Sequence, residues 1–243
     1  MNTRKLIVAT LLAAMSCTPV LAQNDKAEPY FTPEEMPNML KTPLTPPDSL
    51  SAAFSYDLSR FLWGKSMRAT ERGEMAKADA EYGLQVVCRE FAEPFGMEIS
   101  KEKTPEIYRL LLDALPTCAE ISWNPKNHLM RRRPFMVFHE PSLQPKDDEA
   151  LSKNGSFPSG HTILGWSAAL LLSEINPDRA EQIVNRGYLY GESRVIVGAH
   201  WQSDVNAGYL YASVAYAKLH TSDRFLKQMA KARKEFARLS AKK

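Results

Sequence analysis

An uninterrupted apolar stretch follows directly after residues 158–161, PSGH, and sets the strongest limit on the architecture. Residues 163–172 are apolar nearly all the way round a helix, which is the pattern of a helix enclosed by other helices. The stretch is too short to cross a bilayer, because a membrane-spanning helix needs about 20 apolar residues. We therefore predict a helical bundle that surrounds a helix over residues 162–175.

Apolar residues recur at helical spacing through most of the remaining chain, whereas strand patterns are scarce. Two short apolar runs, 135–138 and 195–197, have the composition of strands, but no hairpin turn joins either run to a partner. Pro116 marks the predicted end of one helix. The predicted fold class is all-α, a compact bundle of six to nine helices, which begin at residue 51 and include 77–91, 105–115, 162–175, 179–190, 203–219 and 222–240.

The first 22 residues have the pattern of an export signal peptide. Arg4 and Lys5 precede an apolar stretch of ten residues, and Ala22 closes a small-residue cleavage site. The alternative is an uncleaved membrane anchor, for which ten apolar residues are too few. We therefore expect an exported protein, either periplasmic or secreted, without a membrane span.

Residues 23–50 are predicted to form a proline-rich arm in front of a helical domain over residues 51–243. The segment holds six prolines, whose fixed φ and missing N–H group exclude a regular helix or a central strand. Such an arm can be a simple linker, or it can lie over the core or over a partner subunit. The sequence leaves these alternatives open.

The charge balance of the mature chain is nearly neutral. Removing residues 1–22 takes away two of the 31 basic residues and none of the 28 acidic residues, which leaves a net charge of +1. A nucleic-acid-binding protein normally carries a basic patch or stripe, so the composition argues against that class. Cys17 leaves with the signal, and Cys88 and Cys118 remain as a pair that can form a disulfide in an oxidising compartment.

Three segments place cations and histidines beside glycine or proline, where helices begin or end. In the first, Asn124 is a suitable N-cap and Pro125 a suitable first helical residue. Lys126 and Arg133 then fall on one helix face, two turns apart, so that both charges can reach one anion. Taken alone, this segment fits a solvent-facing basic helix better than an anion site.

The second segment is the turn in front of the apolar stretch. Gly160 lets a ligand approach the backbone, and Ser159 offers a hydroxyl at a helix N-terminus, where free N–H groups attract anions. A simple capping turn accounts for Ser159 and Gly160 but not for His161. We therefore expect His161 to stand over a bound anion.

The third segment contains Arg194, His200 and Asp204. The histidine and the aspartate are four residues apart, which on a helical turn places the carboxylate beside the imidazole. A carboxylate that accepts one ring N–H leaves the lone pair of the other nitrogen free to attack. The alternative is a surface ion pair worth a few tenths of a kcal/mol, but Trp201 and the apolar residues 195–197 favour burial.

Together the segments supply three cations, one helix N-terminus and two histidines, which suits a phosphoryl group with its charged oxygens. The ordered pattern Lys-x6-Arg-Pro, Pro-Ser-Gly-His and Ser-Arg-x5-His-x3-Asp resembles the signature of the phosphatidic acid phosphatase type 2 and vanadium haloperoxidase superfamily. The surrounding sequences LSKNGSFPSGHT, SEINPDR and ESRVIVGAHWQSDVNAG are most similar to the bacterial class A non-specific acid phosphatases. This similarity extends over about residues 50–220.

The resemblance implies a role for each matched residue. His200 would attack phosphorus and form a phosphohistidine, Asp204 would orient it, and His161 would protonate the leaving alcohol and then activate water. Because His161 must start protonated and His200 neutral, with an ordinary imidazole pKa of about 6.5, a mildly acidic optimum is expected. The phosphate oxygens would be bound by Lys126, Arg133 and Arg194, assisted by the Ser159 hydroxyl and the Gly160 amide.

The resemblance further implies an exported homodimer that hydrolyses a broad range of phosphate monoesters without a metal or other cofactor, and that can also transfer phosphate to alcohols. Phosphate and vanadate would be ligands. Three alternatives are kept. A vanadate-dependent haloperoxidase would use the same cations and bond vanadate to His200. A lipid phosphate phosphatase is disfavoured by the missing span, and a non-enzymatic anion-binding module would need no nucleophile.

The sequence also departs from the family pattern. Leu143 and Val197 stand where relatives often carry cysteines, so the family's disulfide cannot be assigned to Cys88 and Cys118. The three remaining histidines match nothing in the signature. No set of His, Cys, Asp or Glu shows metal-ligand spacing, so no metal site is expected.

Overall fold

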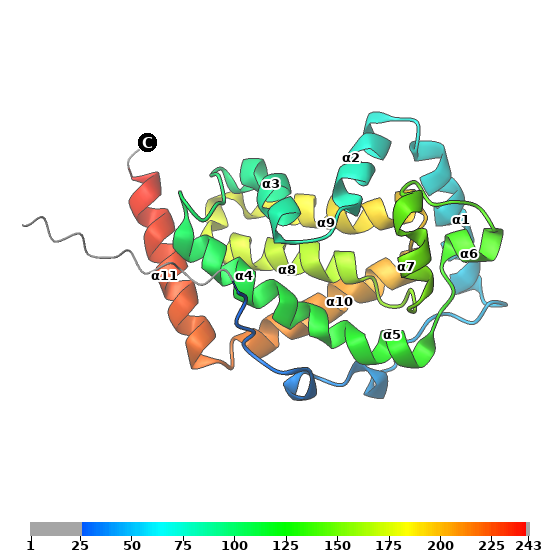
Figure 1. The fold of residues 1–243 in the computed structure, drawn as a ribbon, viewed down its shortest axis with the longest axis horizontal. Helices are drawn as coiled ribbons and strands as arrows, with labels where there is room; N and C mark the ends of the chain where they lie inside the picture. Colours follow the sequence, from blue (N-terminus) through cyan, green and yellow to red (C-terminus); the bar gives the residue numbers. More distant parts are fainter. Residues whose placement is uncertain (1–25, 242–243) are drawn as a thin grey trace, which may run out of the picture.

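The computed structural model describes residues 26–241 of the chain. Throughout this range the regular elements are helices, which pack around a large shared core (Figure 1). The prediction of an all-α, compact multi-helix bundle is confirmed, although the described residues form eleven α-helices rather than the expected six to nine. The predicted signal peptide, residues 1–22, lies outside the described residues. The α-helices are α1 (Ala52–Met67), α2 (Glu71–Ala80), α3 (Leu84–Phe95), α4 (Pro105–Ala119), α5 (Trp123–Leu129), α6 (Pro134–Phe138), α7 (Asp148–Ser152), α8 (Gly160–Ile175), α9 (Ala180–Val197), α10 (Gln202–Leu219) and α11 (Asp223–Ser240).

Helix α8 is the enclosed helix that the apolar stretch predicts. Most of its residues are buried, and it runs between α9, α10 and α4 (Figure 1). Helices α8 and α9 approach closely because Gly165 has no side chain: a Cβ there would lie 2.4 Å from Tyr190 Cδ1. This close approach fixes the place of α8 in the bundle, with His161 in its first turn.

The single helix expected over residues 77–91 is wrong, because two helices, α2 and α3, meet there with a break at residues 81–83. Gly83 has φ of 134°, a backbone conformation that only glycine adopts readily. The break exposes the C-terminal end of α2 and lets residues 80–82 reach the pocket described below.

One other local expectation fails, because burial outweighs local preference. Pro116 does not end its helix, because α4 continues to Ala119 and buries Cys118 on the way. The apolar runs 195–197 and 135–138 are not strands: the first forms the buried last turn of α9, and the second lies within the short helix α6. Short apolar runs of this kind do not distinguish a strand from a buried helical turn.

The proline-rich segment lies over the core rather than away from it. Residues 26–50 contain only two short 3-10 helices, η1 (Pro33–Glu35) and η2 (Met39–Lys41), and run along α4 and α5 (Figure 1). The Tyr30 backbone N–H donates to Thr117 Oγ1 on α4 at 2.9 Å, and Met39 is buried. The arm therefore packs against α4 and α5, which both contribute residues to the pocket.

Cys88 and Cys118 are both buried free thiols, and burial raises the pKa of each to about 12. Such thiols are inert at neutral pH. Over residues 26–241, no helix combines the length and the apolar character that a bilayer span requires.

Candidate active site

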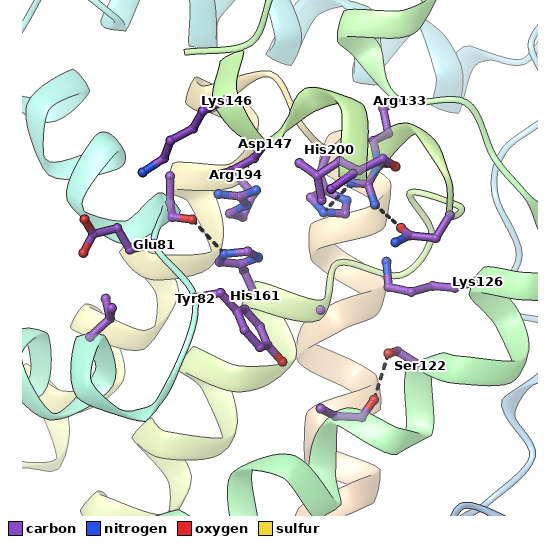
Figure 2. A pocket seen from close by; sticks show the side chains of 17 residues that line it. Glu81, Tyr82, Ser122, Lys126, Arg133, Lys146, Asp147, His161, Arg194 and His200 are labelled. Atoms are coloured by element: carbon purple, nitrogen blue, oxygen red, sulfur yellow. Dashed lines mark hydrogen bonds between the residues drawn. The ribbon is translucent and has the colours of Figure 1, made fainter. Parts of the chain in front are cut away.

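The three segments singled out in the sequence meet at one pocket of about 630 Å³. Lys126 enters from α5, Arg133 from the start of α6, His161 from the first turn of α8, Arg194 from the end of α9, and His200 from the α9–α10 connection (Figure 2). Gly160 also lines the pocket, and an added Cβ there would lie 3.7 Å from the Lys126 side chain. The predicted convergence of these residues is therefore present in the fold.

Two predicted site residues lie behind the pocket wall. Ser159 is completely buried, and its Oγ accepts from the Thr162 backbone N–H at 3.3 Å, so the side chain caps α8. The capping alternative thus accounts for what the Ser159 Oγ accepts, while the contact of its hydroxyl with phosphate stays a prediction. Asp204 is also completely buried and lies behind His200.

Lys126 and Arg133 do not share a helix face, which corrects the expected geometry. Helix α5 begins at Trp123 rather than after Asn124, and ends where Met130 adopts φ of 42°. Arg133 has extended backbone, as is usual before a proline, and it precedes α6. Both cations reach the pocket through the turn between two helices, not along one helix.

Arg133 is fixed by a dense set of acceptors. Its Nε donates to Leu151 O at 2.8 Å, and its Nη2 donates to Asn154 Oδ1 at 2.5 Å. Its Nη1 donates to Ala199 O and also lies 3.0 Å from His200 Nε2. The guanidinium is therefore held in place before any ligand arrives.

Within the described residues, four Lys and Arg side chains line the pocket, against two carboxylates, those of Glu81 and Asp147. Arg133 and Arg194 are 1% and 2% exposed, and burial lowers the pKa of each to about 10. Burial and repulsion from Arg133 lower the pKa of Lys126 to about 7. Within the described residues, Arg194 Nε and Nη1 make no hydrogen bond. Because buried donors are nearly always paired, these groups suit the oxygens of an anion.

His200 is held as one defined tautomer. A guanidinium only donates, so His200 Nε2, at 3.0 Å from Arg133 Nη1, carries the lone pair. Its Nδ1 then carries the hydrogen and lies 3.4 Å from Asp204 Oδ2. The two residues do not lie on one helical turn, because His200 precedes α10 and Asp204 belongs to the first turn of that helix. The expected pairing is present, across a helix N-terminus.

His161 uses its other nitrogen as an anchor. Its Nε2 donates to Ala80 O, the last carbonyl of α2, at 3.0 Å, which leaves Nδ1 as the nitrogen available for proton transfer. The ring of Tyr82 packs edge-on against it, with centroids 4.9 Å apart. The end of α2 is fixed by Asp79, which is completely buried and accepts from Ser193 Oγ at 2.6 Å.

The surroundings of both histidines disfavour their charged forms. Burial and the charge of Arg194 hold the pKa of His161 well below its usual range. Burial and the charge of Arg133 do the same for His200. The expectation that His161 starts protonated therefore requires a negative charge close to the ring, since a nearby anion favours the imidazolium form.

The buried histidines make stability depend on pH. In the unfolded chain each takes up a proton near pH 6.5, but in the fold each resists it, so the unfolded state binds more protons below that pH. The free energy of unfolding is therefore expected to fall as the pH drops from 7.5 to 5.5. Urea unfolding midpoints measure this loss, and the variant His161→Gln should lose less than the wild type. An equal loss in both proteins would contradict the assignment.

Several pocket residues were not predicted from the sequence. Lys146 and Asp147 line the pocket, and Tyr82 flanks His161, but none belongs to a recognisable motif (Figure 2). The Ala80 carbonyl has no sequence signal at all. Within residues 26–241, His, Cys, Asp and Glu side chains do not form a group of three or more that could hold a metal ion.

Comparison with known proteins places the chain in a family. Residues 110–225 match the model of the PAP2 superfamily. The non-specific acid phosphatase of Providencia stuartii is 45% identical over 80% of this chain and 79% of its own length. That of Salmonella typhimurium (strain LT2) is 37% identical over 87% and 85%, and the acid phosphatase of Zymomonas mobilis is 38% identical over 97% and 90%. The chain therefore belongs to the PAP2 superfamily, in the family of the bacterial non-specific acid phosphatases.

Proposed function

We propose that this protein is an acid phosphatase that hydrolyses a broad range of phosphate monoesters through a phosphohistidine at His200. One observation carries the proposal: two buried donors of Arg194, unpaired within residues 26–241, share a pocket with a histidine whose Nε2 lone pair is oriented by Arg133. A phosphoryl group satisfies both, because its oxygens accept from the cations while its phosphorus accepts the lone pair. The relatives named as acid phosphatases support the phosphatase activity, and the phosphohistidine is our inference from the pocket.

The reaction follows in two balanced steps. The hydrogen bond from Arg133 Nη1 to His200 Nε2 is released as the Nε2 lone pair forms the N–P bond. The P–O bond to the alcohol breaks in the same step, and the proton on His161 Nδ1 passes to the leaving oxygen. His161, now neutral, then takes a proton from water as the water oxygen bonds to phosphorus. The P–N bond breaks, His200 recovers its lone pair, and inorganic phosphate leaves. The cations stabilise the charge on the phosphoryl oxygens in both steps.

A direct experiment tests the proposal against its rivals. Purified protein is assayed with p-nitrophenyl phosphate, and separately for halide oxidation by peroxide in the presence of vanadate. We expect hydrolysis that vanadate inhibits, and no halide oxidation. Vanadate-dependent oxidation would identify a haloperoxidase, and phosphate binding without turnover would identify an anion-binding module. Preferential hydrolysis of phosphatidic acid in vesicles would point to a lipid phosphatase.

Four further parts of the proposal come from the sequence and its resemblance. We propose that the protein is exported to the periplasm or secreted, acts without a metal, forms a homodimer and transfers phosphate to alcohols as well as to water. Cell fractionation, activity in the presence of EDTA, light scattering and product analysis with added glycerol test these points one by one.

The variant Lys126→Ala is expected to raise KM about tenfold at pH 6 with a much smaller change in kcat, because it removes one of three charges that bind phosphate in ground and transition states alike. Since the pKa of Lys126 is about 7, its advantage should fade as the pH rises past 7. Steady-state kinetics at pH 6 and pH 8.5 measure both effects. A KM ratio that does not change between these pH values would argue against the assigned charge.

A further inference from the structure

A second cluster of charges lies behind the pocket wall and reaches the nucleophile through Asp204. Arg131 Nη1 donates to Asp204 Oδ1 at 2.6 Å, and Arg131 Nη2 donates to Asp57 Oδ2 at 2.8 Å. The two carboxylates are completely buried, and the Arg131 side chain is 10% exposed. None of the three lines the pocket. They come from α1, from the turn after α5 and from α10, so that only the folded bundle brings them together.

Asp57 also fixes the first turn of α10. Its Oδ1 accepts from the Ser203 backbone N–H at 2.7 Å, and its Oδ2 accepts from the Ser203 hydroxyl at 2.6 Å. The first N–H groups of a helix have no partner within the helix, so a carboxylate from another helix can cap them. Asp204 belongs to this same turn, and its position is therefore set from α1.

The distance between Asp204 and His200 is long enough for their hydrogen bond to shorten and strengthen during the reaction. Asp204 Oδ2 accepts from the Trp201 backbone N–H at 2.8 Å and lies 3.4 Å from His200 Nδ1. Within the described residues, His200 Nδ1 makes no hydrogen bond of good geometry. When Nε2 is phosphorylated, the ring becomes cationic and its Nδ1–H is drawn to the carboxylate. Such bonds often tighten only as the reaction proceeds.

Asp57 balances the charge of the cluster. Arg131 alone would neutralise Asp204 and weaken its attraction for the cationic ring. With Asp57 present, the two carboxylates and one guanidinium keep a net charge of −1 beside His200. This charge faces an imidazole whose pKa is lowered by burial and by the charges of Arg133, Lys126 and Arg194, and raised by a hydrogen bond with the Ser156 backbone.

We propose that Arg131 and Asp57 are positioning residues for the nucleophile: they hold Asp204 at His200 Nδ1 and preserve its negative charge for the phosphorylated ring. This inference rests on the proposed function, since it requires a phosphohistidine. Three consecutive arginines precede Pro134, and Arg133 lines the pocket. Of the other two, only Arg131 has a positioning role, because Arg132 is exposed and donates to Met136 O.

The test compares Arg131→Gln, Arg131→Lys and Asp57→Asn with Arg132→Gln as the matched control. For p-nitrophenyl phosphate we expect kcat to fall about 10- to 100-fold in Arg131→Gln and Asp57→Asn, as small displacements of reacting groups do. The inhibition constant of inorganic phosphate should change less than about threefold, because the pocket cations stay in place. Arg131→Lys should recover part of kcat, and Arg132→Gln should match the wild type.

Two outcomes would overturn the inference. One is an Arg131→Gln enzyme with the kcat of Arg132→Gln. The other is a loss of kcat and phosphate affinity in parallel, unrelieved in Arg131→Lys, which would show a purely structural role. If Arg131→Gln does not fold, the kcat and the phosphate inhibition constant of Arg131→Lys and Asp57→Asn decide the question. Failure of the proposed function itself looks different: the wild type would form no phosphohistidine, whatever the variants do.

Discussion

The variant His200→Ala is expected to lose about 10⁴-fold or more in kcat and to form no covalent phosphoenzyme, because loss of a nucleophile removes the first step altogether. The cations Lys126, Arg133 and Arg194 remain, so inorganic phosphate should still bind. Hydrolysis of p-nitrophenyl phosphate measures kcat. Labelling with ³²P substrate followed by an alkaline quench measures the phosphoenzyme, since the P–N bond of phosphohistidine survives in base.

The matched control is His128→Ala, which changes an exposed histidine on α5 outside the pocket and should behave as the wild type. Full activity in His200→Ala would remove the mechanism. Loss of activity together with loss of phosphate binding would show instead that the substitution disturbed the cation cluster, and the phosphate inhibition constant separates these cases.

The second large effect is expected for His161→Ala, and its size should depend on the leaving group. With an alkyl substrate such as glycerol phosphate, kcat should fall about 10²- to 10⁴-fold, because the leaving alkoxide needs the proton that His161 Nδ1 supplies. With p-nitrophenyl phosphate the first step should suffer far less, because its leaving group is stable without a proton. The second step still needs a base for water, so phosphohistidine should accumulate.

Rapid-quench measurement of the phosphoenzyme with both substrates tests this division of labour. An equal loss for both substrates, with no accumulation, would contradict a general acid at His161. A suitable comparison is Tyr82→Phe, which keeps the ring that packs against His161 and removes only the hydroxyl.

Much of the site was accessible from local sequence patterns. The apolar run after Gly160 predicted the enclosed helix α8, and the order of the three segments predicted which cations and histidines would meet. The break at Gly83 was missed, although a glycine is a recognised interruption of a helix, because the flanking residues continue the apolar spacing. The carbonyl of Ala80 was beyond reach, since every residue has one and only packing selects it.

The amino-acid sequence by itself determined which segments form helices and whether each helix is apolar on one face or all the way round. It also determined that a cation or a histidine stands at the ends of several of these helices. These properties depend on periodicity and capping, which act over a few residues. Only the tertiary structure decided which of three consecutive arginines faces the pocket, which holds Asp204 and which meets solvent. The physical reason is that a buried charge is tolerated only beside partners, and the partners of Arg131, Asp57 and Asp204, lie 74 and 73 residues away along the chain.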